Sequence, residues 1–112
     1  MTARAFPLVI DQGSSYELTI PVVNSEGGPA SVVGWSAYGQ IRRSVTDSSV
    51  LYQLPLTVQT TAVVLRIPAS QSSLWEFRNG RYDIEIVSPD TGTTSRLLEG
   101  PVVVRPEVTR AP

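Results

Sequence analysis

Apolar and polar side chains alternate over several short segments of the chain, most clearly in residues 80–87. The apolar positions there are Tyr82, Ile84 and Ile86, and the charged positions between them are Arg81, Asp83 and Glu85. A period of two places one set of side chains in a core and the other in water, which predicts a half-buried strand. Residues 88–92 contain the proline, aspartate and glycine of a hairpin turn, so residues 95–104 are expected to return as its partner strand.

The same alternation predicts about seven strands in all. They are expected at residues 6–10, 16–23, 35–43, 50–54, 61–67, 80–87 and 95–104. Clusters of glycine, proline, serine and aspartate separate these segments. Such a series, with a buried tryptophan in the third strand, is typical of an all-β, immunoglobulin-like antiparallel sandwich of two sheets, and a small barrel is the other architecture that fits.

Residues 69–77 lack the alternation, which indicates a short helix or 3₁₀ turn before the sixth strand. Its large side chains are expected to cap the core: Leu74, Trp75 and Phe77. The whole chain, residues 1–112, then forms one sandwich domain. Residues 1–5 and 105–112 carry few apolar groups, so we expect them to be extended terminal arms.

The pattern leaves two packing details open. Gly39 interrupts the apolar row of the third strand, as happens at a bulge or at a close approach of another backbone. In the last strand, Arg96 opposite Glu85 would pair opposite charges, whereas burial of Leu98 requires a register one residue away. A bulge at Gly100-Pro101 would reconcile the two.

The composition excludes several classes of chemistry. The chain has no cysteine and no histidine, which excludes cysteine nucleophiles, Ser-His-Asp triads and the usual zinc and haem ligand sets, so no cofactor is expected. The net charge of −1 and a pI near 5.3 argue against a nucleic-acid partner. No signal-peptide pattern and no apolar run of ~20 residues is present, so no membrane partner is expected either.

Acidic residues are the candidates for a catalytic or metal-binding site, but their pattern is not specific. Asp83 and Glu85 project from one face of a strand roughly 6 to 7 Å apart, near the spacing of glycosidase carboxylates. A hydrated face balanced by Arg81 and Arg96 explains them more simply. Turn formation likewise explains the loop aspartates that calcium could use, which are Asp11, Asp47 and Asp90.

Several segments together resemble a family of small bacteriophage virion proteins and immunoglobulin-like modules of phage baseplates and tail fibres. The matching residues are Ile10-Asp-Gln-Gly13 with Tyr16, Gly34-Trp-Ser-Ala37 with Gln40-Ile-Arg42, Leu65-Arg-Ile-Pro-Ala69, Gly80-Arg-Tyr-Asp-Ile-Glu85, Arg96-Leu-Leu-Glu-Gly100 and Pro106-Glu-Val-Thr-Arg110. They cover nearly the whole chain in the family's order. Trp35 replaces the usual tyrosine, and Gly39 replaces a large apolar residue.

The resemblance implies a non-enzymatic structural component of a virion, assembled in the host cytoplasm and docked on the tail, baseplate or fibre attachment region. Its partners would be other phage structural proteins, and it would be present in several copies of a symmetric assembly. The terminal arms supply the candidate contacts Arg4, Phe6, Arg105, Glu107, Val108 and Arg110. Two alternatives stay open: a capsid decoration protein, and a carbohydrate- or receptor-binding module that uses exposed aromatics such as Tyr38 and Tyr52.

Overall fold

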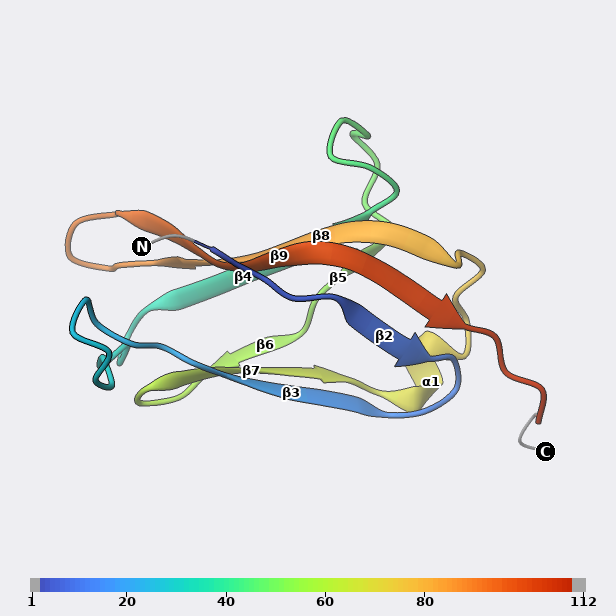
Figure 1. Cartoon of the computed structure of the whole chain (residues 1–112), viewed down its shortest axis with the longest axis horizontal. Helices are drawn as coiled ribbons and strands as arrows, with labels where there is room; N and C mark the ends of the chain where they lie inside the picture. Colours follow the sequence, from blue (N-terminus) through green and yellow to red (C-terminus); the bar gives the residue numbers. More distant parts are fainter. Residues whose placement is uncertain (1–2, 110–112) are drawn as a thin grey trace.

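The computed structural model describes residues 3–109, and it confirms a sandwich of two β-sheets (Figure 1). The larger sheet has the order β1-β9-β8-β4-β5, with β2 also paired to β9, and the smaller sheet has the order β3-β7-β6. The larger sheet contains β1 (Arg4–Ala5), β2 (Leu8–Asp11), β4 (Ser36–Arg42), β5 (Tyr52–Gln53), β8 (Asn79–Val87) and β9 (Thr94–Arg105). The smaller sheet contains β3 (Tyr16–Pro21), β6 (Leu56–Val58) and β7 (Ala62–Ile67).

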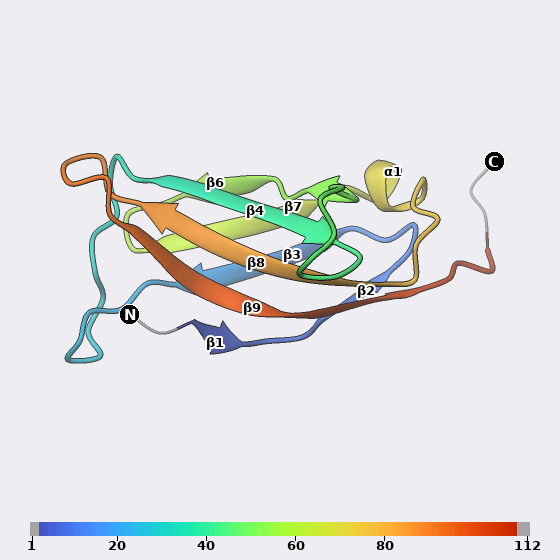
Figure 2. The ribbon, with the colours of Figure 1, turned by 90° about the horizontal axis from the view of Figure 1, so that it is seen from above.

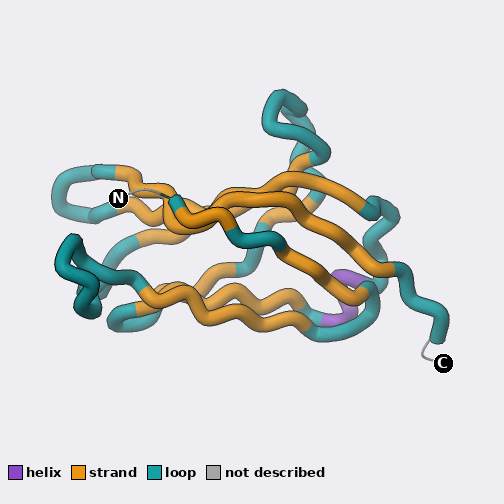
Figure 3. Tube along the Cα trace, viewed as in Figure 1, coloured by secondary structure: helices purple, strands orange, loops and turns teal. Residues whose placement is uncertain are grey.

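The helix predicted before the sixth strand is present as α1 (Ala69–Ser72), at one end of the sandwich (Figure 3). Trp75 and Phe77 are buried beyond it, as expected, and their rings stack 4.9 Å apart. The expectation for Leu74 was wrong, because 74% of its surface is exposed. No helix within residues 3–109 is long and apolar enough to cross a membrane.

The N-terminal strand differs from the prediction in its pairing. Two short strands, β1 and β2, replace one strand, and Phe6 and Pro7 separate them. Both run parallel to β9, with Arg4 opposite Leu98 and Leu8 opposite Val102 (Figure 2). An otherwise antiparallel sandwich therefore has one edge formed by a parallel, interrupted strand. Arg4 and Ala5 belong to this edge, although composition predicts an extended arm there.

Strand β6 is absent from the sequence-based prediction, which expects no strand between residues 54 and 61. The residues after Pro55 alternate over only three positions, and the apolar Leu56 and Val58 are half-buried. This strand pairs with β7 and completes the smaller sheet. Pro21 ends β3, which is an edge strand, so its missing N–H costs little there.

The hairpin of β8 and β9 settles the register question. Arg96 does lie opposite Glu85, and Leu98 lies opposite Ile84, so Leu97 is the extra residue of a bulge. The bulge is thus not at Gly100-Pro101. Leu97 and Leu98 are adjacent, and both are buried, at 5% and 4% exposure. Since neighbouring residues of a regular strand point to opposite faces, an extra residue helps to bury both leucines.

Neighbouring atoms approach Gly39 closely, which is one of the two explanations that the sequence offers for a glycine in this row. A Cβ at this position would lie 2.9 Å from Leu54 Cδ1 and 3.0 Å from the Asp83 carbonyl oxygen. Ile41, on the same face of β4, is completely buried. The missing side chain at Gly39 lets Leu54 fill the core beside it.

Candidate functional site

The terminal residues expected to make contacts lie in two separate places. Arg4 is in β1 opposite Leu98, and Phe6 follows it with 39% of its surface exposed. Arg105 is the last residue of β9, opposite Asp11. Seven positions of β9 separate Leu98 from Arg105, which is about 23 Å along a strand. The expected contact residues therefore do not form one site.

A hydrogen bond from Tyr82 holds the N-terminal segment in place at Phe6. The Tyr82 hydroxyl donates a hydrogen bond of 2.5 Å to the Phe6 carbonyl oxygen, and the Phe6 N–H donates to the Glu99 carbonyl oxygen at 2.9 Å. A Cβ on Gly100 would lie 2.6 Å from the same Phe6 oxygen. Burial, with a smaller effect of Tyr16, raises the pKa of Tyr82, so its hydroxyl keeps the proton that it donates.

Hydrogen bonds of Gln12, the residue after β2, hold the C-terminal segment in place. Gln12 Nε2 donates to the Trp75 carbonyl oxygen at 2.8 Å, and its Oε1 accepts from the Glu107 N–H at 3.1 Å. Its own N–H donates to the Arg105 carbonyl oxygen at 2.9 Å. One side chain thus ties the segment after β9 to the segment after α1.

Gly13 and Ser72 complete this contact. The Gly13 N–H donates to Ser72 Oγ at 3.0 Å, and that hydroxyl, which is completely buried, lies 3.3 Å from the Ser14 carbonyl oxygen. Gly13 has a φ of +83°, and a Cβ there would overlap the carboxylate of Glu107. Any other residue would therefore be strained at this φ, and the Glu107 side chain would have to move aside.

We call Gln12, Gly13, Ser72 and Glu107 the terminal clamp. The pattern of residues in the sequence did not predict the terminal clamp. Two of the segments that resemble the phage family, those with Gln12-Gly13 and Pro106-Glu107, come together in it. Beyond the clamp, Val108 is 94% exposed, and Arg110 lies outside the described residues. Val108 is therefore an accessible candidate contact residue just beyond the clamp.

Asp11 and Arg105 form an exposed ion pair beside the clamp, with 2.5 Å between Oδ1 and Nε. The hydrogen bond from Arg105 lowers the pKa of Asp11 and raises the pKa of Arg105.

Asp47, another of the loop aspartates considered for calcium, accepts a hydrogen bond at Oδ1 from the Ser49 N–H at 2.9 Å, which is a turn contact. The described residues include no cluster of acidic side chains suited to a metal ion.

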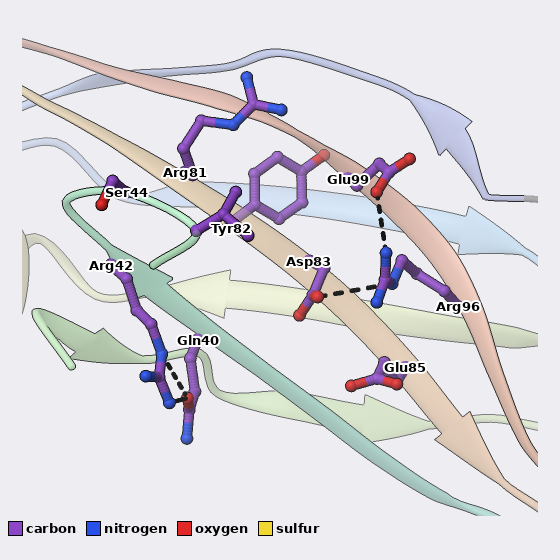
Figure 4. Close-up of a pocket in the computed structure, with 10 residues that line it drawn as sticks. Gln40, Arg42, Ser44, Arg81, Tyr82, Asp83, Glu85, Arg96 and Glu99 are labelled. Carbon is purple, nitrogen blue, oxygen red and sulfur yellow. Dashed lines mark hydrogen bonds and ion pairs between the residues drawn. The ribbon is translucent and has the colours of Figure 1, made fainter. Parts of the chain in front are cut away.

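The carboxylates of β8 lie on the outer face of the larger sheet, over a shallow hollow of about 340 Å³ (Figure 4). Arg96 reaches Asp83 at 3.5 Å and Glu99 at 3.1 Å. Glu85 lies opposite Arg96 in the register, but within residues 3–109 no ion pair joins them. Arg96 thus balances Asp83 on a half-exposed face, as the simpler interpretation expects, but no ion pair of Arg81 or Glu85 is found within residues 3–109.

The two tyrosines of the carbohydrate hypothesis lie on different faces. Tyr38 is 56% exposed on the outer face of β4. Tyr52 lies opposite the buried Ile41, and its ring meets Trp75 edge-on at 4.8 Å. The expectation that both are exposed on a sheet face was wrong for Tyr52, so the pair cannot form one stacking platform.

A second, more apolar groove of about 300 Å³ separates the edges of the two sheets. Its walls come from β1, β3 and β9, with Phe6, Leu18, Ile20 and Leu98 as the large apolar side chains. Arg4 adds a positive charge to this lining. The groove is where Phe6 meets the smaller sheet.

Comparison with known proteins identifies the family. A comparison with curated proteins gave no match. The family model described as "LtfC-like, beta-sandwich domain" matches residues 2–105, which is nearly the whole length of the sandwich and includes Gln12, Gly13 and the β8–β9 hairpin. The chain belongs to the LtfC-like β-sandwich domain family, which is related to phage tail fibres.

Proposed function

We propose that the chain is a non-enzymatic structural component of a bacteriophage virion that docks at the tail, baseplate or fibre attachment region. The observation that carries the proposal is the family match over residues 2–105. The chemistry of the surface agrees with it: the sequence has no histidine or cysteine, and Asp83, one member of the acid pair on β8, forms an ion pair with Arg96.

The shape of the domain supports a role as a connecting module. The sandwich measures 46 × 30 × 21 Å, and the described N- and C-terminal segments lie toward opposite ends of its long axis (Figures 1 and 2). A partner at one end would meet Arg4 and Phe6, and a partner at the other would meet Val108. Because Tyr82 and the terminal clamp hold these segments in place, they would be presented at low entropic cost.

Truncation after Glu107 tests this proposal while the clamp stays complete. We expect the shortened chain to fold with unchanged stability and to be lost from purified particles, because the exposed Val108 and the residues after it are removed. Val108→Asp should have the same effect with a single substitution. Val33→Asp is the matched control, since Val33 is also exposed, at 67%, and lies in the loop before β4 rather than in a terminal segment. Normal incorporation of the truncated chain would contradict docking through the C-terminal segment.

A further inference from the structure

The outer face of the larger sheet carries charges in ordered rows across β4, β8 and β9. Three positions of β8 set the rows: Arg81, Asp83 and Glu85. Their neighbours on β4 are Arg42, Gln40 and Tyr38, and those on β9 are Pro101, Glu99 and Arg96. The face thus holds three arginines and three carboxylates.

The positive end of this face has no internal carboxylate partner among the described residues. Arg42 and Arg81 lie directly opposite each other, an arrangement that costs stability when both are charged. The Arg42 guanidinium binds neutral acceptors only, Gln40 Oε1 at 2.8 Å and the Asp47 carbonyl oxygen at 2.9 Å. Within the part of the chain that the structure describes, no carboxylate lies within ion-pair distance of Arg81.

The opposite end of the face carries a carboxylate that is also unpaired within the described residues. Glu85 has no ion-pair partner within residues 3–109, since Arg96 turns toward Asp83 and Glu99. Figure 4 shows Arg81 and Glu85 at opposite sides of the hollow, with Asp83 between them and Arg96 to the side of Asp83. Four positions along β8 separate Arg81 from Glu85, about 14 Å. A charge arrangement of this kind is complementary to its own copy after rotation by 180°.

We propose that this face binds a second copy of the chain across a two-fold axis that crosses β8 at Asp83. Arg81 of each copy then faces Glu85 of the other copy, which gives two opposite-charge contacts. The axis passes through the row of Gln40, Asp83 and Glu99, where Arg96 already compensates part of the charge of the two carboxylates. Arg42 faces Tyr38 of the second copy, where a guanidinium can stack on the ring. The inference goes beyond docking on a particle and does not depend on it.

Two further observations favour a second copy as the occupant. Residues 43–51 rise above this face (Figure 1), and Val45, 82% exposed, lines the hollow on the side of Arg42. The rotation brings this apolar side chain toward the exposed ring of Tyr38. The chain's net charge of −1 adds little repulsion between copies. The contact area is a small sheet face, so the dimer is weak and depends on concentration.

Charge reversal tests the pairing, with sedimentation equilibrium of the purified chain as the readout. Arg81→Glu alone and Glu85→Arg alone should each weaken self-association at least about tenfold, because like charges then face each other. An equimolar mixture of the two variants should dimerise, and so should the double variant, since each restores opposite charges at both contacts. Raising the salt concentration should weaken the wild-type dimer.

The matched controls are Arg66→Glu and Glu17→Arg on the smaller sheet, where the two residues form an exposed ion pair. They should leave self-association unchanged, and unfolding in urea should show that every variant is folded. A wild-type chain that stays monomeric at about 1 mM, where a Kd of that size would still give a large dimeric fraction, overturns the proposal. So does a mixture of the two variants that fails to dimerise.

Discussion

Tyr82 in β8 donates its hydroxyl hydrogen bond to the Phe6 carbonyl oxygen, 76 positions away in the sequence. The bond spans β9 at Gly100, the position opposite Tyr82. It holds the chain at the point where β1 gives way to β2, so an interrupted parallel strand becomes a defined edge. The candidate contact residues Arg4 and Phe6 owe their position to this bond.

Tyr82→Phe should therefore destabilise the domain while leaving its core filled. The ring stays buried, but the Phe6 carbonyl oxygen loses its donor, and we expect a loss of about 1–2 kcal/mol in the free energy of unfolding measured in urea. Tyr38→Phe is the control, because its ring lies exposed on the outer face and no hydrogen bond of its hydroxyl is seen in residues 3–109. Equal stability of the Tyr82 variant and the wild type would show that the bond contributes nothing.

Gly100→Ala should act on the same edge by a steric route. The new methyl group would meet the Phe6 backbone, whose carbonyl oxygen would lie only 2.6 Å from the added Cβ, so β1 must move away from β9. We expect a loss of about 1–3 kcal/mol and faster amide exchange at Phe6, whose N–H bonds to Glu99. Gly28→Ala is the matched control, since the nearest atom there lies 3.6 Å away. Unchanged exchange at Phe6 would contradict the close approach.

Ser72→Ala should weaken the terminal clamp. Ser72 is completely buried, and its removal leaves the Gly13 N–H without its acceptor, at a cost of about 1–3 kcal/mol. The neighbouring Ser73 is exposed, and its hydroxyl bonds only within its own turn, so Ser73→Ala should change stability by less than about 0.5 kcal/mol. Urea unfolding of both variants makes the comparison, and equal effects of the two would argue against the clamp.

The ion pair of Asp11 and Arg105 predicts a pH dependence. Because the folded-state pKa of Asp11 is lowered from 3.8, its stabilising effect is complete above that pH and is lost as the pH falls through the folded-state value. Wild type should thus exceed Asp11→Asn in stability at pH 6, and the difference should vanish under more acidic conditions. Urea midpoints measured from pH 6 down to about 2.5 test this. A difference that does not shrink as the pH falls through this range would contradict the ionic origin.

The sequence predicted which face of a strand each side chain lies on better than it predicted which strands pair with each other. Alternation along residues 80–87 correctly assigned Tyr82, Ile84 and Ile86 to the core, because a period of two is a local property of one strand. It could not reveal that β1 and β2 pair with β9 in parallel, since that pairing joins segments more than 90 positions apart. The location of the bulge was readable in principle, as the adjacent Leu97 and Leu98 cannot share one face of a regular strand.

The candidate site was predicted less well for the same reason. Terminal composition drew attention to Arg4, Glu107 and Val108, but not to Gln12, whose side chain joins three distant segments. A glutamine followed by glycine is common in turns, and only the folded chain shows what it binds. The rows of charge on the outer face likewise depend on the register of β4, β8 and β9, which pattern alone leaves undetermined.

The most direct test of the proposed function is whether purified phage particles carry the chain, and in which part. Quantitative mass spectrometry of heads and tails separated from purified particles should find the chain with the tails, in a fixed ratio to tail proteins. Recovery with the heads, or absence from particles altogether, would contradict its assignment as a component of the tail, baseplate or fibre attachment region.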